Sequence, residues 1–195
     1  ICSTSSKSQL FRLGIMAGVN SSMNQFYTFG DVNGADSKLG YNANAFARIQ
    51  ILKFNIQPEL GYLSNRVGIS FIENGKIVEG NFSIGQMYMA APVGFKLSKI
   101  RLQAGPYLTF SSNQSFDQLT SKESYIEQID NGDIKVGGLI NLGIDISKKW
   151  SLDARFARSF TTSDFSSVVQ KKAQTFEGNT GMLSLSIGYT LFKTK

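Results

Sequence analysis

The chemistry open to this chain is limited by the side chains it lacks. Its 195 residues contain 20 Lys and Arg and 14 Asp and Glu, but no histidine and one cysteine, Cys2. Histidine most often moves protons near neutral pH, so mechanisms that depend on it are excluded. A zinc site of His and Cys is excluded too. The sequence has neither a phosphate-binding loop nor a dinucleotide-binding motif. We therefore expect no metal and no cofactor.

Charged residues also occupy the polar positions of segments in which every second residue is apolar. They are Arg12, Arg48, Glu59, Lys96, Arg101, Lys135, Asp145, Asp153 and Arg155. We expect a buried salt-bridge network in which Glu59 pairs with Arg48, Arg101 and Arg155, and Asp153 with Arg155. Such a network has two interpretations, a gate or path for small ions and a plug that keeps charges paired in a narrow interior. We favour the plug.

A third candidate site is the polar stretch 21–38, which carries Phe26, Tyr27 and Phe29. Exposed aromatic side chains are typical of partner contacts, and the alternative is packing on the rim of the fold. The same stretch contains Asp31-x-Asn33-Gly34-x-Asp36, which partly resembles a calcium loop but lacks its full spacing and distal Glu. We favour an Asn-Gly turn flanked by solvated acids.

The elements that position these residues are β-strands. Residues 135–156 show the unit, two alternating segments joined by Ser147, Lys148 and Lys149. Side chains alternate across a strand, so each segment has one apolar face and one polar or small face. The unit recurs along the chain. The predicted strands are residues 11–20, 41–50, 54–62, 84–97, 100–111, 135–146, 150–157 and 182–192.

The links between these strands alternate in length. Short links lie near residues 52–53, 98–99 and 147–149, and long links near 21–38, 66–82, 112–133 and 160–180. An up-and-down meander then has all long links at one end and all short links at the other. Asn74-Gly75 predicts that strands three and four continue as a hairpin, and Thr120-x-x-Glu123 predicts a short helix in the third long link.

Two kinds of eight-stranded barrel fit this pattern, a soluble lipocalin-like barrel with an apolar interior and a membrane barrel with an apolar exterior. The polar face carries many small side chains, which suits a narrow interior. Aromatic residues of the apolar face gather at both strand ends, as in the girdles of membrane barrels. They are Phe11, Phe54, Phe95 and Trp150 near the short links, and Tyr41, Tyr62 and Phe110 near the long ones. Lysines also gather at the short links. We favour the membrane barrel.

Length and composition set the remaining bounds. No apolar run reaches the roughly 18 residues that a membrane helix needs. The net charge of +6 is not gathered into a basic patch, so we expect no nucleic-acid partner. Residues 1–9, ICSTSSKSQ, are interpreted as an N-terminal leader or residual signal segment, and residues 10–195 as one barrel domain. Cys2 is a lipidation candidate, but an unpaired cysteine is favoured.

Several stretches in order along the chain resemble one family. They are Gly40-Tyr41 with the following strand, Asn55-Ile56-Gln57-Pro58-Glu59-Leu60-Gly61-Tyr62, residues 88–92, Leu102-Gln103-Ala104-Gly105-Pro106 and Trp150-Ser151-Leu152-Asp153-Ala154-Arg155-Phe156. The chain resembles the PorT-like, or porin family, small outer-membrane β-barrel proteins of Bacteroidota. The resemblance implies an eight-stranded antiparallel up-and-down transmembrane barrel in the bacterial outer membrane. Four long extracellular loops, three short periplasmic turns and two periplasmic termini follow from this topology.

The barrel enzymes known from outer membranes, which include lipases, deacylases, palmitoyl transferases and omptin-type proteases, resemble one another in needing a histidine. A chain without histidine is therefore predicted to be non-enzymatic. We expect it to contact outer-membrane lipids and to bind a protein partner through its extracellular loops, as an accessory subunit of an outer-membrane complex. The alternatives are a narrow channel or small-solute porin and, less favoured, the soluble lipocalin-like barrel. Eight strands exclude a wide pore.

Overall fold

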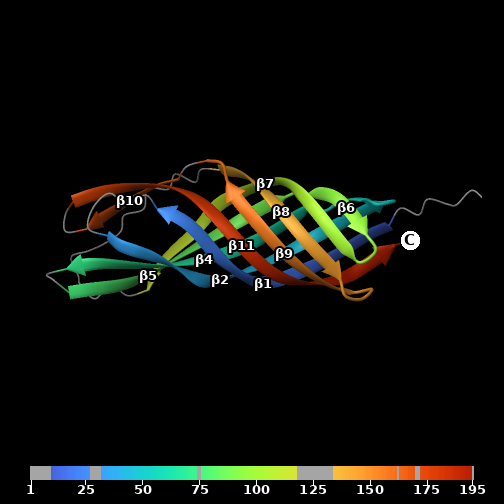
Figure 1. Cartoon of the computed structure of the whole chain (residues 1–195), viewed down its shortest axis with the longest axis horizontal. Coiled ribbons are helices and arrows are strands. Elements are labelled where there is room, and N and C mark those ends of the chain that lie inside the picture. The colour runs from blue at the N-terminus through green and yellow to red at the C-terminus, as the bar shows by residue number, and fades with distance from the viewer. Residues whose placement is uncertain are drawn as a thin grey trace, which may run out of the picture.

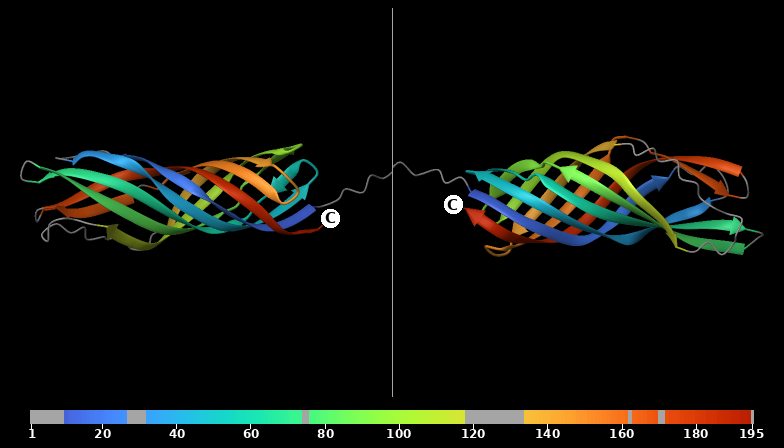
Figure 2. Two further views of the ribbon diagram at one scale, coloured as in Figure 1. Left: turned by 90° about the horizontal axis from the view of Figure 1, so that it is seen from below. Right: turned by 180° about the vertical axis from the view of Figure 1, so that it is seen from behind.

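The computed structural model describes residues 10–26, 32–73, 76–117, 134–161, 163–169 and 172–194. These residues form one twisted antiparallel sheet that closes on itself (Figures 1 and 2). Its strands are β1 (Leu10–Phe26), β2 (Val32–Ile51), β3 (Phe54–Ile56), β4 (Glu59–Glu73), β5 (Lys76–Ala90), β6 (Val93–Leu97), β7 (Ile100–Asp117), β8 (Ile134–Asp145), β9 (Trp150–Ser159), β10 (Ser163–Val169) and β11 (Lys172–Thr194).

Closure follows from the pairing of β1, which is hydrogen-bonded to β2 on one side and to β11 on the other. The ring then runs β1, β11, β9, β8, β7, β5, β4, β2 and back to β1. β3 continues into β4 and β5 into β6, while β10 pairs only with β11. The described chain is therefore a closed, eight-stranded, antiparallel β-barrel, and the predicted fold class is confirmed.

Two predicted strands are interrupted at prolines. The strand predicted over residues 54–62 breaks between β3 and β4 at Gln57-Pro58, and the strand over 84–97 breaks between β5 and β6 at Ala91-Pro92. Proline cannot donate to a sheet ladder, so pairing fails where its nitrogen should contribute. A backbone hydrogen bond connects the two interruptions, in which the Gln57 amide donates to the Pro92 carbonyl at 2.9 Å.

The strands extend furthest at the end away from the short links. β4 and β5 pair as far as Glu73 opposite Lys76, which confirms the predicted hairpin. The prediction of loops over 21–38 and 160–180 is wrong in part. β1 reaches Phe26, β2 starts at Val32, and β10 forms a second hairpin with the first residues of β11. β7 likewise continues to Asp117. The helix predicted at 120–123 lies outside the described residues.

Figure 1 shows the consequence for the shape of the molecule. The tips of β4, β5, β10 and β11 project together beyond one end of the barrel, and the C-terminus lies at the other end beside the start of β1. We call these two ends the hairpin end and the short-turn end. The short-turn end carries the turns at residues 52–53, 98–99 and 146–149. Leu52 and Ser98 hold positive φ values of 58° and 56° in two of them, as tight hairpin turns require.

The outer wall of the barrel is apolar. Side chains such as Ile15, Ile140 and Ile187 are 50–55% exposed on it. Phe54 and Phe95 pack together at the short-turn edge with ring centroids 4.8 Å apart, and Tyr41 and Tyr62 approach at 6.3 Å nearer the hairpin end. An apolar band between two aromatic belts matches the outer surface of a transmembrane barrel. The described residues include no helix long and apolar enough to cross a membrane.

The interior is polar along its length, with the charged residues near the short-turn end and one apolar cluster further along. Its apolar cluster is Leu63, Tyr88, Ala90, Tyr107, Leu139, Ala157 and Met182. In β7 and β9 these residues follow the charged ones, so the cluster lies on the hairpin side of the charges. A polar interior under an apolar wall is the reverse of a soluble ligand-binding barrel, and the lipocalin-like alternative is not supported.

Candidate functional site

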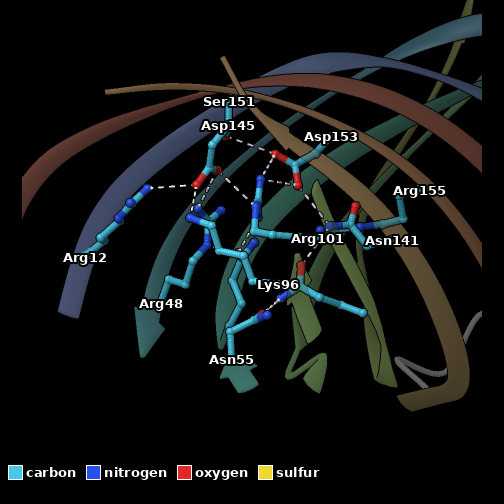
Figure 3. A network of polar contacts seen from close by, with 12 residues as sticks. Arg12, Arg48, Asn55, Lys96, Arg101, Asn141, Asp145, Ser151, Asp153 and Arg155 are labelled. Atoms are coloured by element: carbon cyan, nitrogen blue, oxygen red, sulfur yellow. Dashed lines mark hydrogen bonds and ion pairs between the residues drawn. The ribbon is translucent and has the colours of Figure 1, made fainter. Parts of the chain in front are cut away.

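The charged side chains of the interior converge in one layer at the short-turn end (Figure 3). Each projects inward because its position has the polar parity of its strand. They are Arg12 on β1, Arg48 on β2, Glu59 on β4, Lys96 on β6, Arg101 on β7, Asp145 on β8, and Asp153 and Arg155 on β9. Seven strand segments are thus joined by side chains across the lumen.

Asp145 is the first centre of this layer. Its Oδ2 atom lies 2.5 Å from Nζ of Lys96 and 3.3 Å from Nη1 of Arg12. Its Oδ1 atom lies 3.1 Å from Nε of Arg101 and 3.4 Å from Nη1 of Arg48. A single buried carboxylate therefore has four cationic neighbours, contributed by four different strands.

Asp153 is the second centre. Nη2 of Arg101 donates to both of its carboxylate oxygens, at 3.1 and 3.0 Å. Asn141 Nδ2 donates to Oδ1 at 2.9 Å, and Ser151 Oγ to Oδ2 at 3.0 Å. Gly143 leaves room for the pair, since a Cβ there would lie 2.5 Å from Arg101 Nη2 and 2.6 Å from Asp153 Oδ1. The absence of a side chain at that position allows the ion pair to form.

Glu59 is the third centre, and its side chain is fully buried. Arg155 Nη2 donates to Oε1 at 2.7 Å, and Gln57 Nε2 donates to the same atom at 2.7 Å. Asn44 Nδ2 donates to Oε2 at 2.7 Å. Arg155 also reaches the hydroxyl of Tyr88 at 3.4 Å, which connects the charged layer to the apolar cluster above it.

Gln57 links the three centres into one network. Its Oε1 atom accepts from Nε of Arg48 at 2.5 Å and from Nη1 of Arg101 at 3.1 Å, while its amide nitrogen donates to Glu59. Gln103 adds a neutral branch, because it accepts from Asn141 and donates to Asn55. Charged groups that share hydrogen bonds in this way are held in one arrangement.

The layer fills the lumen at its level. Arg101 and Asn141 are fully inaccessible to solvent, and Gln103, which lies opposite Asn141 on the adjacent strand, is nearly so. Removing one partner of a buried ion pair typically costs about 3–5 kcal/mol, because the other charge stays buried without compensation. The site therefore holds buried charges paired across the lumen.

The five residues predicted to form the network all lie in this layer, with partly different partners. Glu59 pairs with Arg155, and Gln57 connects it to Arg48 and Arg101. Asp153 pairs with Arg101 rather than with its strand neighbour Arg155.

Sequence reasoning missed the central position of Asp145 and its contacts with Arg12 and Lys96. Parity placed all three inward. The tilt and stagger of the barrel decide which strands face each other across the bore. The alternation of side chains within one strand does not reveal those facing strands.

The structure describes only part of one of the three predicted partner-binding residues, Phe26, Tyr27 and Phe29. Phe26 is the last residue of β1, and its backbone is paired with Gly178. Its side chain, and the whole of Tyr27 and Phe29, lie outside the described residues. Their role in binding stays a prediction.

The calcium-like segment begins outside the described residues at Asp31 and continues into β2 from Val32. Within the described part of the chain, no group of three or more His, Cys, Asp or Glu side chains is placed to hold a metal ion.

Comparison with known sequences identifies the family. The family model described as outer membrane protein beta-barrel domain matches residues 5–164, which is most of the chain. The protein therefore belongs to the outer membrane protein beta-barrel domain family, and its place is the bacterial outer membrane, in contact with lipid. No curated protein matches the sequence significantly. The PorT-like assignment within this family stays a resemblance.

Solved structures agree with this fold. The chain is similar to the Neisserial surface protein A, with 13% identity and a TM-score of 0.52, over 92% of this chain and 97% of that one. It is also similar to the outer membrane protein OprG from Pseudomonas aeruginosa, with 8% identity and a TM-score of 0.53, over 94% of this chain and 95% of that one. At these identities the likeness shows the fold alone.

Proposed function

We propose that the protein is a non-enzymatic outer-membrane barrel that binds a partner through its hairpin end, as an accessory subunit of an outer-membrane complex. The observation that carries the proposal is the charged layer across the lumen, whose central side chains are inaccessible to water. Side chains that fill the bore at this level favour a role that does not depend on transport through it. The surface left for recognition is the end where the strands project beyond the barrel (Figure 2).

The proposed orientation places the short-turn end and both termini in the periplasm and the hairpin end at the cell surface. Outer-membrane barrels have short periplasmic turns and longer extracellular connections, and the described turns at 52–53, 98–99 and 146–149 are short. Segments mounted on a rigid barrel are where binding residues usually lie. The lack of histidine in the sequence supports a role without catalysis.

The test is a barrel whose hairpins are trimmed. Short turns replace residues 67–82 of the β4–β5 hairpin and residues 163–178 of the β10–β11 hairpin, and partners are captured by cross-linking on intact cells and identified by mass spectrometry. The trimmed barrel should reach the outer membrane but lose the partner that the full chain captures.

The matched control is Asn141→Asp, which changes the lumen and leaves the hairpins intact. It should keep the partner. A trimmed barrel that retains the partner and the cellular role, together with a lumen variant that loses both, would overturn the proposal in favour of transport through the bore.

A further inference from the structure

The charged layer is not electrically balanced. Five cationic side chains, Arg12, Arg48, Lys96, Arg101 and Arg155, face three carboxylates, Asp145, Asp153 and Glu59. The pairs Arg155–Glu59 and Arg101–Asp153 are neutral. The remaining three cations share Asp145, which leaves an excess of two positive charges at the short-turn mouth of the lumen.

Four buried guanidinium nitrogens of the layer lack a hydrogen-bond partner among the described residues, and two of them belong to Arg12 and Arg48. Nη2 of Arg48 and Nε of Arg12 are buried and make no hydrogen bond to any part of the chain that the structure describes. The Arg48 side chain is only 2% exposed. Buried donors without acceptors are unfavourable and rare in folded proteins. Both the charge and the hydrogen bonding therefore call for an anionic acceptor.

The geometry holds these donors ready for such a group. Gln57 fixes Nε of Arg48 at 2.5 Å, and the ring of Phe46 lies 5.0 Å from its guanidinium carbon, so Nη2 has a set direction. Figure 3 shows Arg12, Arg48 and Lys96 directed toward Asp145 from different strands. The Lys96 side chain keeps 13% exposure and lies on the short segment β6 beside a turn. It is the most exposed of these three cations.

We propose that the short-turn mouth of the barrel binds one phosphate-class oxyanion, held by Arg12, Arg48 and Lys96 beside Asp145. Guanidinium groups match the paired oxygens of such an anion, and an ammonium group adds a point charge. A dianion matches the excess of two positive charges. The proposal is independent of the partner-binding role, because it concerns the opposite end of the barrel.

A phosphoryl group can reach this mouth from two sources, as a free anion in the aqueous phase or as a lipid headgroup from the adjacent membrane face. Exposed lysines at the turns, among them Lys53 and Lys148, would draw either toward the opening. The experiment below separates the two sources, and both agree with the proposed chemistry.

Binding is measured on the full chain folded in alkyl maltoside micelles, which carry no phosphate. Inorganic phosphate is titrated at constant ionic strength against chloride, by calorimetry and by thermal unfolding. We expect saturable binding of one phosphate per barrel and a rise in Tm, because a ligand that binds only the folded state stabilises it. Heat and Tm changes that chloride reproduces at equal ionic strength would overturn the proposal.

Substitutions locate the site. Arg48→Gln should weaken phosphate binding at least about tenfold, the ratio expected for one lost charge-assisted hydrogen bond. Lys99→Gln removes the same charge from the exposed rim of the same end and should leave binding unchanged. If Arg48→Gln does not fold, Lys96→Gln replaces it, since that side chain is the most exposed of the three. Equal losses in the lumen and rim variants would contradict the proposed site.

Asp145→Asn gives a change in the opposite direction. The carboxylate of Asp145 competes with the anion for the same cations, so its removal should tighten phosphate binding. Phosphate should also restore more stability to this variant than to the unmodified barrel. Weaker or unchanged binding would contradict the proposal.

The two sources are then compared in nanodiscs of digalactosyldiacylglycerol, whose headgroup carries no phosphate, with and without phosphatidic acid. Suppression of phosphate binding by phosphatidic acid assigns the site to a lipid headgroup. Unchanged phosphate binding assigns it to the free anion. Absence of phosphate binding in discs that lack phosphatidic acid, after its detection in micelles, would overturn a site in the membrane-embedded protein.

Discussion

The two ends of the barrel are built under different constraints. Around the short-turn end, each strand has lipid on one side and a crowded lumen on the other, so apolar outward side chains alternate with inward ones that are mostly polar, charged or small. At the hairpin end, the β4–β5 and β10–β11 pairs project beyond the ring and are joined to it through one or two neighbours only. The buried ion pairs of Asp145, Asp153 and Glu59 therefore lie around the short-turn end, and not in the projecting hairpins.

The largest effect expected is loss of a buried partner at the short-turn end. Glu59→Ala leaves the Arg155 guanidinium buried without its carboxylate, and we expect a loss of about 3–5 kcal/mol in the free energy of unfolding. The measurement is urea unfolding in micelles. The double variant Glu59→Ala/Arg155→Ala should lose less than the sum of the two single losses, and additive losses would show that the pair is not coupled.

The next effect concerns the lipid-facing wall. Ile140 is exposed on the outer face near the middle of β8. An arginine there should cost about 2–4 kcal/mol in folding into a bilayer, and about 0–1 kcal/mol near the membrane interface. Leu97→Arg, beside the short turn at 98–99, is the matched variant. Equal costs at the two positions would mean that the apolar band does not lie across the bilayer as described.

A smaller effect is expected from overpacking the network. Gly143→Ala places a methyl group against both Arg101 and Asp153, so the pair must shift. We expect a cost of about 1–3 kcal/mol, which is the usual range for an added methyl group in a packed interior. Thermal unfolding in micelles measures it. Gly188→Ala is a weaker comparison, since its Cβ would meet the ends of Ser151 and Met16, and Met is adaptable.

The smallest effect is expected at the hairpin end. Trimming residues 67–82 and 163–178 should cost less in unfolding free energy than Glu59→Ala. The charged layer is untouched, and the ring pairs that are lost, such as Val67 with Ser37 and Phe82 with Phe116, lie at the outer edge of the sheet. Urea unfolding in micelles measures this difference. A trimmed barrel that loses as much stability as Glu59→Ala would break the contrast between the two ends.

The same contrast explains what the sequence could predict. Strands in the ring carry an apolar face because they contact lipid. The alternation of apolar and polar residues therefore predicts the number of strands, and it predicts which residues point inward, such as Arg101 and Asp153. Beyond the ring no bilayer imposes that pattern, so the sequence predicts a long link near 160–180 where the structure has β10 and the first half of β11. The hairpin at Asn74-Gly75 was found because its turn has a chemical signature of its own.

Pairing across the lumen was predicted only in part. Inward parity is a property of one strand, whereas the meeting of Asp145 with Arg12 and Lys96 depends on how three strands are staggered around the ring. The prolines at 58 and 92 show a related limit. Their backbone chemistry predicted a disturbance in the ladder, but the Gln57 to Pro92 hydrogen bond that bridges it required the structure.

The central claim is that the charged layer closes the bore, and conductance across planar bilayers tests it most directly. The unmodified protein should give no steady single-channel current, because Arg101, Asn141 and their neighbours leave no path for hydrated ions. Large, stable currents from the unmodified barrel would contradict the claim, and would make a narrow channel the better account of its function.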